Sequence, residues 1–133
     1  MNGRQQVLLQ DDINASGDVM WRMHTNATVS VDSGGTSATL TLEGQTLKVA
    51  ILNPPSGAQF TKADAVRLPG DSKPPPGQVD QPNPGVTVLI IDLPAGEYSL
   101  QVLFSPQWPG LQQSDYVTPT SVPLSSWSLT SHN

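Results

Sequence analysis

Apolar residues recur at every second position in several separate segments of this 133-residue chain. Successive side chains of a β-strand point to opposite faces of its sheet, so this period predicts strands with one buried face. The composition agrees, because 13 prolines and 11 glycines disfavour helices and suit turns. We expect an all-β chain with strands at 6–10, 19–25, 28–32, 36–42, 46–53, 86–93 and 97–104, and shorter candidates at 59–60, 63–66 and 127–129.

Two short connections contain glycine and join neighbouring strands. They predict two β-hairpins, one over 36–53 and one over 86–104. Segment 86–93 is apolar on both faces, which predicts a central strand that is covered on two sides. Eight or nine short strands with turn signals between them predict an antiparallel β-sandwich.

A proline-rich stretch at 73–85 interrupts the strand pattern. It could separate two domains or connect two strands, and we favour the connection because each side alone is too small to bury a sound core. We expect a single domain over 1–133, with a solvated loop at 73–85 and a polar C-terminal tail at 111–133. The residues expected to be buried between two sheets are Val19, Trp21, Met23, Leu40, Leu47, Val49, Ile51, Val88, Ile90, Leu100 and Val102.

The charge balance excludes several kinds of partner. Six Lys and Arg residues stand against 11 Asp and Glu residues, and no basic cluster offers a surface for nucleic acid. No apolar run approaches the roughly 18 residues of a membrane helix, and the N-terminal stretch lacks the apolar core of a signal peptide. The chain has no cysteine, which excludes disulfides and thiolate metal ligands. We expect no nucleic-acid partner, no membrane insertion and no cofactor.

The residues that catalysis or metal binding would need are sparse. Of the two histidines, His132 lies next to the C-terminus, so His24 is the only credible general base. The alternative for His24 is a strand histidine that is hydrogen-bonded at a sheet surface. Asp11, Asp12 and Asp18 could suggest calcium, but their spacing lacks the alternating oxygen ligands and the closing Glu of a calcium loop. We therefore predict neither a catalytic residue nor a metal site.

The aromatic residues offer a candidate binding site. Trp108 lies between two prolines in Ser-Pro-Gln-Trp-Pro-Gly, where its indole could stack on a sugar ring or a partner, or form a lid over the sandwich edge. Tyr116 lies in the polar tail, where it could dock that tail onto the body. We name Trp108, Gln107 and Tyr116 as candidate carbohydrate-binding residues. Asn14 and Asn26 each begin an Asn-x-Ser/Thr triplet and are glycosylation candidates.

Several stretches together resemble a known family. They are QVLLQDDI at 6–13, GDVMWRMHTNATVSV at 17–31, ATLTLEGQTLKVAILNPPSGAQF at 38–60 and QPNPGVTVLIIDLPAGEYSLQVLFSPQWPG at 81–110. In their order and spacing they resemble the C-terminal β-sandwich of heparinase II/III-like polysaccharide lyases, especially the fungal ones. The resemblance spans roughly residues 5–130.

The resemblance implies a structural module. Lyases of this family have a helical toroid before their β-sandwich layers, and they cleave uronic-acid polysaccharides by β-elimination with Tyr and His as acid and base. Those catalytic residues lie on the toroid and on the earlier sheet region, and no matching motif is present in this chain. Trp21 and His24 match a strand motif of the C-terminal sandwich, for which the implied role is structural. We therefore expect this chain not to be an enzyme.

Three functional hypotheses follow. The first is a non-catalytic module, related to the lyase C-terminal domain, that binds a polysaccharide or a cell-surface glycan. The second is a small secreted effector of the fungal type, for example an immunomodulatory protein, that self-associates and does not bind sugar. The third, and least favoured, is a residual lyase. The resemblance implies an extracellular location.

Self-association is a separate expectation. It rests on the open edges of a sandwich, because unpaired backbone groups there invite pairing. The long strands 46–53 and 97–104 carry only Lys48 and Glu97 as charged residues. We expect a homodimer through a sheet edge or an apolar sheet face. The alternative is a monomer whose proline-rich loop and tail cover the exposed surface.

Overall fold

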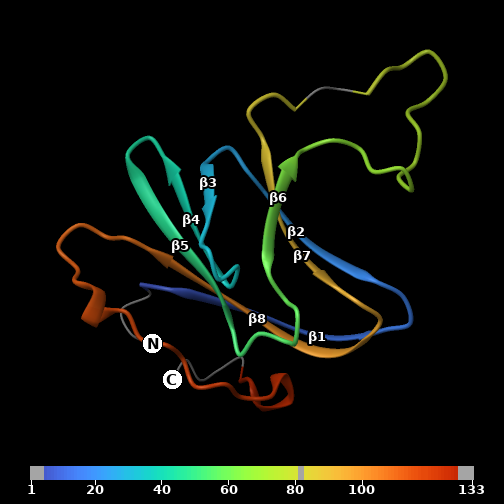
Figure 1. Ribbon diagram of the computed structural model, residues 1–133. Coiled ribbons are helices and arrows are strands. Elements are labelled where there is room, and N and C mark those ends of the chain that lie inside the picture. The colour runs from blue at the N-terminus through green and yellow to red at the C-terminus, as the bar shows by residue number, and fades with distance from the viewer. Residues whose placement is uncertain (1–4, 81–82, 129–133) are drawn as a thin grey trace.

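Two antiparallel β-sheets packed face to face form the fold (Figure 1). The computed structural model describes residues 5–80 and 83–128. Its strands are β1 (Val7–Ala15), β2 (Val19–Thr25), β3 (Thr28–Val31), β4 (Ser37–Leu42), β5 (Gln45–Leu52), β6 (Phe60–Asp64), β7 (Thr87–Leu93) and β8 (Gly96–Pro106). The strand order is β1-β8-β5-β4-β3 in one sheet and β2-β7-β6 in the other. The predicted all-β, antiparallel β-sandwich is confirmed.

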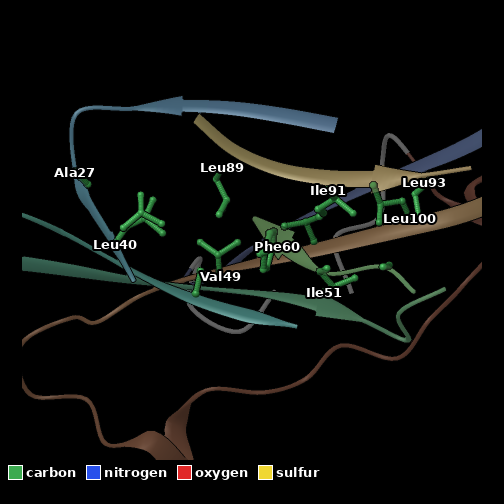
Figure 2. Packing of buried hydrophobic residues seen from close by; sticks show 13 residues of the cluster. Ala27, Leu40, Val49, Ile51, Phe60, Leu89, Ile91, Leu93 and Leu100 are labelled. Carbon is green, nitrogen blue, oxygen red and sulfur yellow. The ribbon is translucent and has the colours of Figure 1, made fainter. Parts of the chain in front are cut away.

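The core lies between the two sheets (Figure 2). The largest fully buried side chains of this layer come from β7 on one side and from β5 and β8 on the other: Leu89, Ile91, Leu93, Val49, Leu100 and Val102. Each large aliphatic side chain contributes about 1.5–3 kcal/mol when it leaves water. Leu40 and Ile51 are buried as predicted. The predicted core residues Val19, Trp21, Met23 and Leu47 pack against this cluster and are only partly buried.

Two predicted core residues lie elsewhere. Val88 and Ile90 are buried, but they belong to a second cluster with Ala65 and Val86. Successive residues of β7 point to opposite faces, so Val88 and Ile90 face away from the layer that holds Leu89. The expectation that they lie between the sheets is wrong. The expectation that 86–93 is a central strand is confirmed, because β7 pairs with β2 on one side and β6 on the other.

The first predicted hairpin forms and the second does not. β4 pairs with β5 around a turn in which Glu43 and Gly44 both have positive φ, of 50° and 79°. Such a two-residue turn matches the right-handed twist of paired strands. β7 and β8, by contrast, lie in different sheets, because both sides of β7 are already paired. The expected hairpin over 86–104 is therefore wrong, and its short connection is a corner between the layers.

Tyr98 closes that corner. Its hydroxyl donates a hydrogen bond of 3.0 Å to the carbonyl oxygen of Pro94. A Cβ atom on Gly96 would lie 2.9 Å from the same hydroxyl, so a larger residue at this position would have to displace the Tyr98 side chain. The chain thus passes from one sheet to the other at the end of β7 without a long loop.

The sheet order settles which strands have a free edge. β5 pairs with β4 and β8, and β8 also pairs with β1, so the two long strands, whose edges could not be derived from the sequence, are both internal. The edges belong to β1 and β3 in one sheet and to β2 and β6 in the other. Lys62 Nζ donates a bond of 2.7 Å to the carbonyl oxygen of Val29, which joins β6 to β3 at one side of the sandwich.

The tail crosses the outer face of the five-stranded sheet. It contains two short 3₁₀ turns, η1 (Gln113–Asp115) and η2 (Leu124–Ser126). Gln101, which is 2% exposed, donates to Ser121 Oγ at 2.8 Å, and Gln10 donates to the carbonyl oxygen of Val122 at 3.1 Å. The expected short strand at 127–129 is not formed at Trp127 and Ser128, and Leu129 lies outside the described residues.

The described parts of the proline-rich loop, 73–80 and 83–85, contain neither strand nor helix. Arg67 and Asp80 form an ion pair of 2.9 Å at its base. Among the described residues, no helix is long and apolar enough to cross a membrane.

Candidate functional site

A cavity of about 390 Å³ opens at one end of the sandwich, and we call it the Trp108 hollow. Its size lies within the range of about 300–1,000 Å³ that is typical of ligand sites. Among the described residues, four apolar side chains, three polar side chains and the 106–108 turn line it: Ala27, Leu40, Leu42, Leu47, Thr25, Gln45, Thr46, Pro106, Gln107 and Trp108. No charged residue is among them. The hollow therefore combines an apolar base with polar groups that carry no charge.

Hydrogen bonds to other parts of the chain hold Trp108. The indole Nε1 donates to the carbonyl oxygen of Gln5 at 3.0 Å, and the backbone nitrogen donates to the Tyr116 hydroxyl at 2.9 Å. The Tyr116 hydroxyl in turn donates to the carbonyl oxygen of Pro106 at 2.8 Å. The side chain is nevertheless 49% exposed. Trp108 is thus held by two hydrogen bonds while about half of its surface stays in contact with solvent.

Gln107 is anchored to the neighbouring strand. Its backbone nitrogen donates to the carbonyl oxygen of Thr46 at 2.8 Å, which continues the pairing of β8 with β5. Its side-chain Nε2 donates to the carbonyl oxygen of Ser105 at 2.8 Å. Gln107 therefore lines the hollow next to Trp108 with an amide whose orientation is also fixed.

Tyr116 has a different position from the other two candidate residues. It lies in the tail and lines a separate cavity of about 340 Å³ between the tail and the five-stranded sheet. Its hydroxyl bonds to the 106–108 turn, and Tyr116 is not among the lining residues of the Trp108 hollow. The structure thus brings Trp108 and Gln107 together at one hollow and makes Tyr116 their support.

Sequence reasoning missed two polar residues that line the hollow, Thr25 and Gln45. Thr25 ends β2 and Gln45 begins β5, so both are far from Trp108 in sequence. Within the described part of the chain, the Gln45 side chain has no hydrogen-bond partner. No local motif marks these residues, because the sheet order alone brings them to the 106–108 turn.

A second cavity adjoins the first, and we call it the His24 hollow. It has a volume of about 700 Å³ and is lined by His24, Thr25, Asn26, Leu42, Asn83 and Val86. Thr25 and Leu42 line both hollows. His24 lies on the exposed face of β2, and in the part of the chain that the structure describes its imidazole has no hydrogen-bond partner. The carboxylate that would orient a catalytic base is thus not bonded to it there.

The aspartates considered for calcium do not form a site. Asp11 and Asp12 are consecutive residues of β1 and therefore point to opposite faces of the sheet. Across residues 5–80 and 83–128, no group of three or more His, Asp or Glu side chains could hold a metal ion.

The two glycosylation candidates are both exposed. Asn14 lies in β1, and its Nδ2 donates to Glu97 Oε1 at 3.1 Å. Asn26 lies in the turn between β2 and β3 and lines the His24 hollow. A glycan on Asn26 would occupy that hollow. Glycosylation at both positions stays a prediction.

No protein-family model matches the sequence, and no curated protein matches it significantly. The resemblance to the lyase C-terminal sandwich therefore stays a prediction.

Proposed function

We propose that this protein is a non-catalytic module that binds carbohydrate in the Trp108 hollow. The observation that carries the proposal is a half-exposed tryptophan, held at both its indole and its backbone nitrogen, beside an apolar base and uncharged polar groups. The apolar face of a sugar ring packs on an aromatic face, and its hydroxyls bond to amides and hydroxyls. Because Trp108 is held before binding, little ordering opposes the interaction.

The lining residues favour an uncharged sugar. Among the described residues, no lysine or arginine lines the Trp108 hollow, and the chain carries a net charge of −5. A negative protein repels an acidic polymer over a Debye length, which is about 8 Å at physiological salt. The proposed ligand is thus a neutral glycan, unlike the uronic-acid polymers that the lyases of the resembling family cleave.

His24 supports the non-catalytic part of the proposal. A base that removes a proton needs a fixed tautomer and orientation, which a neighbouring carboxylate commonly provides. His24 is exposed and has no such partner among the described residues. We expect no increase in the ultraviolet absorbance of unsaturated products when the protein is incubated with uronic-acid polymers. A steady increase that His24→Ala abolishes would contradict the proposal.

A glycan array that carries neutral and acidic oligosaccharides tests the binding. We expect neutral glycans to be retained, and we expect Trp108→Ala to lose them. Trp127→Ala is the matched control, because it removes another half-exposed tryptophan that lies outside the hollow. The absence of retained glycans, or an equal loss in both variants, would contradict the proposal.

A second candidate function is self-association through the outer face of β2-β7-β6. There, Arg22 pairs with Ile90 across two strands, and its Nε atom is buried without a hydrogen-bond partner in the described structure. Met20, on the same face of β2, is 44% exposed. A second copy on this face would cover Met20. Light scattering over a concentration series distinguishes the two states, because a constant mass of 14.1 kDa excludes the homodimer.

A further inference from the structure

We infer that the ligand is an extended oligosaccharide that crosses from the Trp108 hollow into the His24 hollow. This inference rests on the proposed function and adds the length and the course of the ligand. The two hollows share Thr25 and Leu42 as lining residues, so an oligosaccharide can pass from one to the other while it stays in contact with the protein surface.

The arrangement of the strands supports this course. In Figure 1 the loop after β8, the β4–β5 turn and the β2–β3 connection all lie toward one end of the sandwich. These segments carry Trp108, Leu42 and Asn26, respectively. The hollows are therefore consecutive parts of one surface at the end of the sandwich.

The boundary between the hollows is suited to contact with a sugar ring. Leu42 is 49% exposed, although it ends a strand whose other apolar residues are buried. The Thr25 hydroxyl accepts a hydrogen bond of 3.0 Å from the backbone nitrogen of Ala27, which fixes its position. An exposed leucine beside a fixed threonine offers an apolar contact between two polar regions.

The His24 hollow supplies polar groups that are available to a ligand. Within the described residues, neither the His24 imidazole nor the Asn26 amide has a hydrogen-bond partner. Asn83 is held by a bond of 3.2 Å from its Nδ2 to the carbonyl oxygen of Ala65. Imidazole and amide groups both donate and accept, so they match sugar hydroxyls of either orientation. None of the aspartates or glutamates lines this hollow.

The inference predicts that affinity depends on the length of the oligosaccharide. Isothermal titration calorimetry with cello-, xylo- and manno-oligosaccharides, from the monosaccharide to the hexasaccharide, gives the affinity of the unglycosylated protein at each length. In the series that binds, we expect affinity to rise about tenfold or more once the chain is long enough to reach the second hollow, equivalent to about 1.4 kcal/mol.

Two variants test whether the increase in affinity comes from contacts in the His24 hollow. His24→Ala and Asn26→Ala each remove a side chain of the His24 hollow, and we expect both to lower the affinity for the longest oligosaccharide about five- to tenfold. The affinity for the shortest oligosaccharide that binds should not change. Ser30→Ala is the matched control, because it truncates an exposed polar residue of the neighbouring strand β3 outside both hollows.

The outcomes separate the inference from the proposed function. If affinity is independent of length, or if the two variants weaken short and long chains equally, the second hollow does not bind sugar and the inference is wrong. The proposed function would survive that result, because the Trp108 hollow would still bind. If no oligosaccharide binds at any length, both the proposed function and the inference are wrong.

Discussion

Trp108 and Trp127 expose similar fractions of their side chains, 49% and 44%, yet they are held very differently. The Trp108 indole donates to Gln5 at 3.0 Å, and its backbone nitrogen donates to Tyr116 at 2.9 Å. Trp127 donates to Val122 at 3.4 Å, a longer bond that stays within the tail. Only Trp108 lines the cavity at the end of the sandwich.

The two tryptophans therefore have similar exposure but different anchoring, and our proposal assigns binding to the anchored one. An exposed aromatic side chain gains little from a ligand if binding must first order it. Trp108 is ordered by contacts that come from the opposite end of the sequence and from the tail. The fixed orientation and the adjoining hollow together distinguish a binding surface from an apolar side chain at the surface.

Of the three tryptophans, Trp21 should contribute most to the free energy of unfolding. Trp21 lies on β2 and packs against the core between the sheets. We expect Trp21→Ala to lower the free energy of unfolding by about 3 kcal/mol, the low end for a buried tryptophan because the side chain is only partly buried. Urea denaturation followed by circular dichroism measures this change. A loss below about 1 kcal/mol would place Trp21 outside the core.

Substitutions at Trp108 should affect binding more than stability. We expect Trp108→Ala to weaken the neutral glycan at least about tenfold, with a loss of about 1 kcal/mol or less in the free energy of unfolding. Trp108→Phe keeps an aromatic face and loses the bond to Gln5, so it should retain more of the affinity. Calorimetry on both variants measures the difference. Equal affinity in Trp108→Ala and Trp108→Phe would show that stacking is not involved.

The two tyrosines test whether the support of Trp108 matters. Tyr116→Phe removes the hydroxyl that bonds to Trp108 and Pro106, and we expect it to lower stability by about 1 kcal/mol and glycan affinity about threefold. Tyr98→Phe removes a similar bond to Pro94 at the corner between β7 and β8. It should lower stability similarly and leave affinity unchanged. If both variants weaken binding alike, the effect of Tyr116 is on general stability.

Trp127 should give the smallest effect. Its side chain is half-exposed, and its 3.4 Å bond to Val122 contributes little. We expect Trp127→Ala to change the free energy of unfolding by less than about 0.5 kcal/mol and to leave glycan affinity unchanged. The same denaturation and calorimetry apply. A loss of affinity equal to that of Trp108→Ala would remove the distinction between the two tryptophans.

The fold was predictable where the signal was local. The turn at Glu43 and Gly44 specified the β4–β5 hairpin, and alternation specified the face of β2 that packs on the core. The connection after β7 has a similar local pattern, but β7 pairs with β2 and β6, so β8 lies in the other sheet. The local sequence does not show that β2 and β6, rather than β8, pair with β7. The second half of β1 was missed because three of its five residues, Asp11, Asp12 and Asn14, are polar, and its strand structure depends on pairing with β8.

The candidate site likewise contains residues that a local motif predicts and residues that only the strand order brings together. Trp108 and Gln107 are neighbours in a proline-bounded turn, so their contribution was predictable from sequence. Gln45 and Thr25 reach the hollow only through the order of the strands. Tyr116 was predicted as a ligand contact, which stays a prediction, and its hydroxyl bonds to Trp108 and Pro106 in the turn.

Nuclear magnetic resonance tests the central claim most directly, because the three tryptophans give three separate indole N–H signals. Titration with the neutral oligosaccharide of highest affinity should shift the Trp108 signal and the side-chain amide signals of Gln45 and Gln107. The Trp21 and Trp127 signals should stay in place. Saturating shifts at Trp108 with unchanged signals from the other two would agree with a sugar site at this hollow. Shifts at Trp127 alone, or none at any tryptophan under saturating sugar, would contradict it.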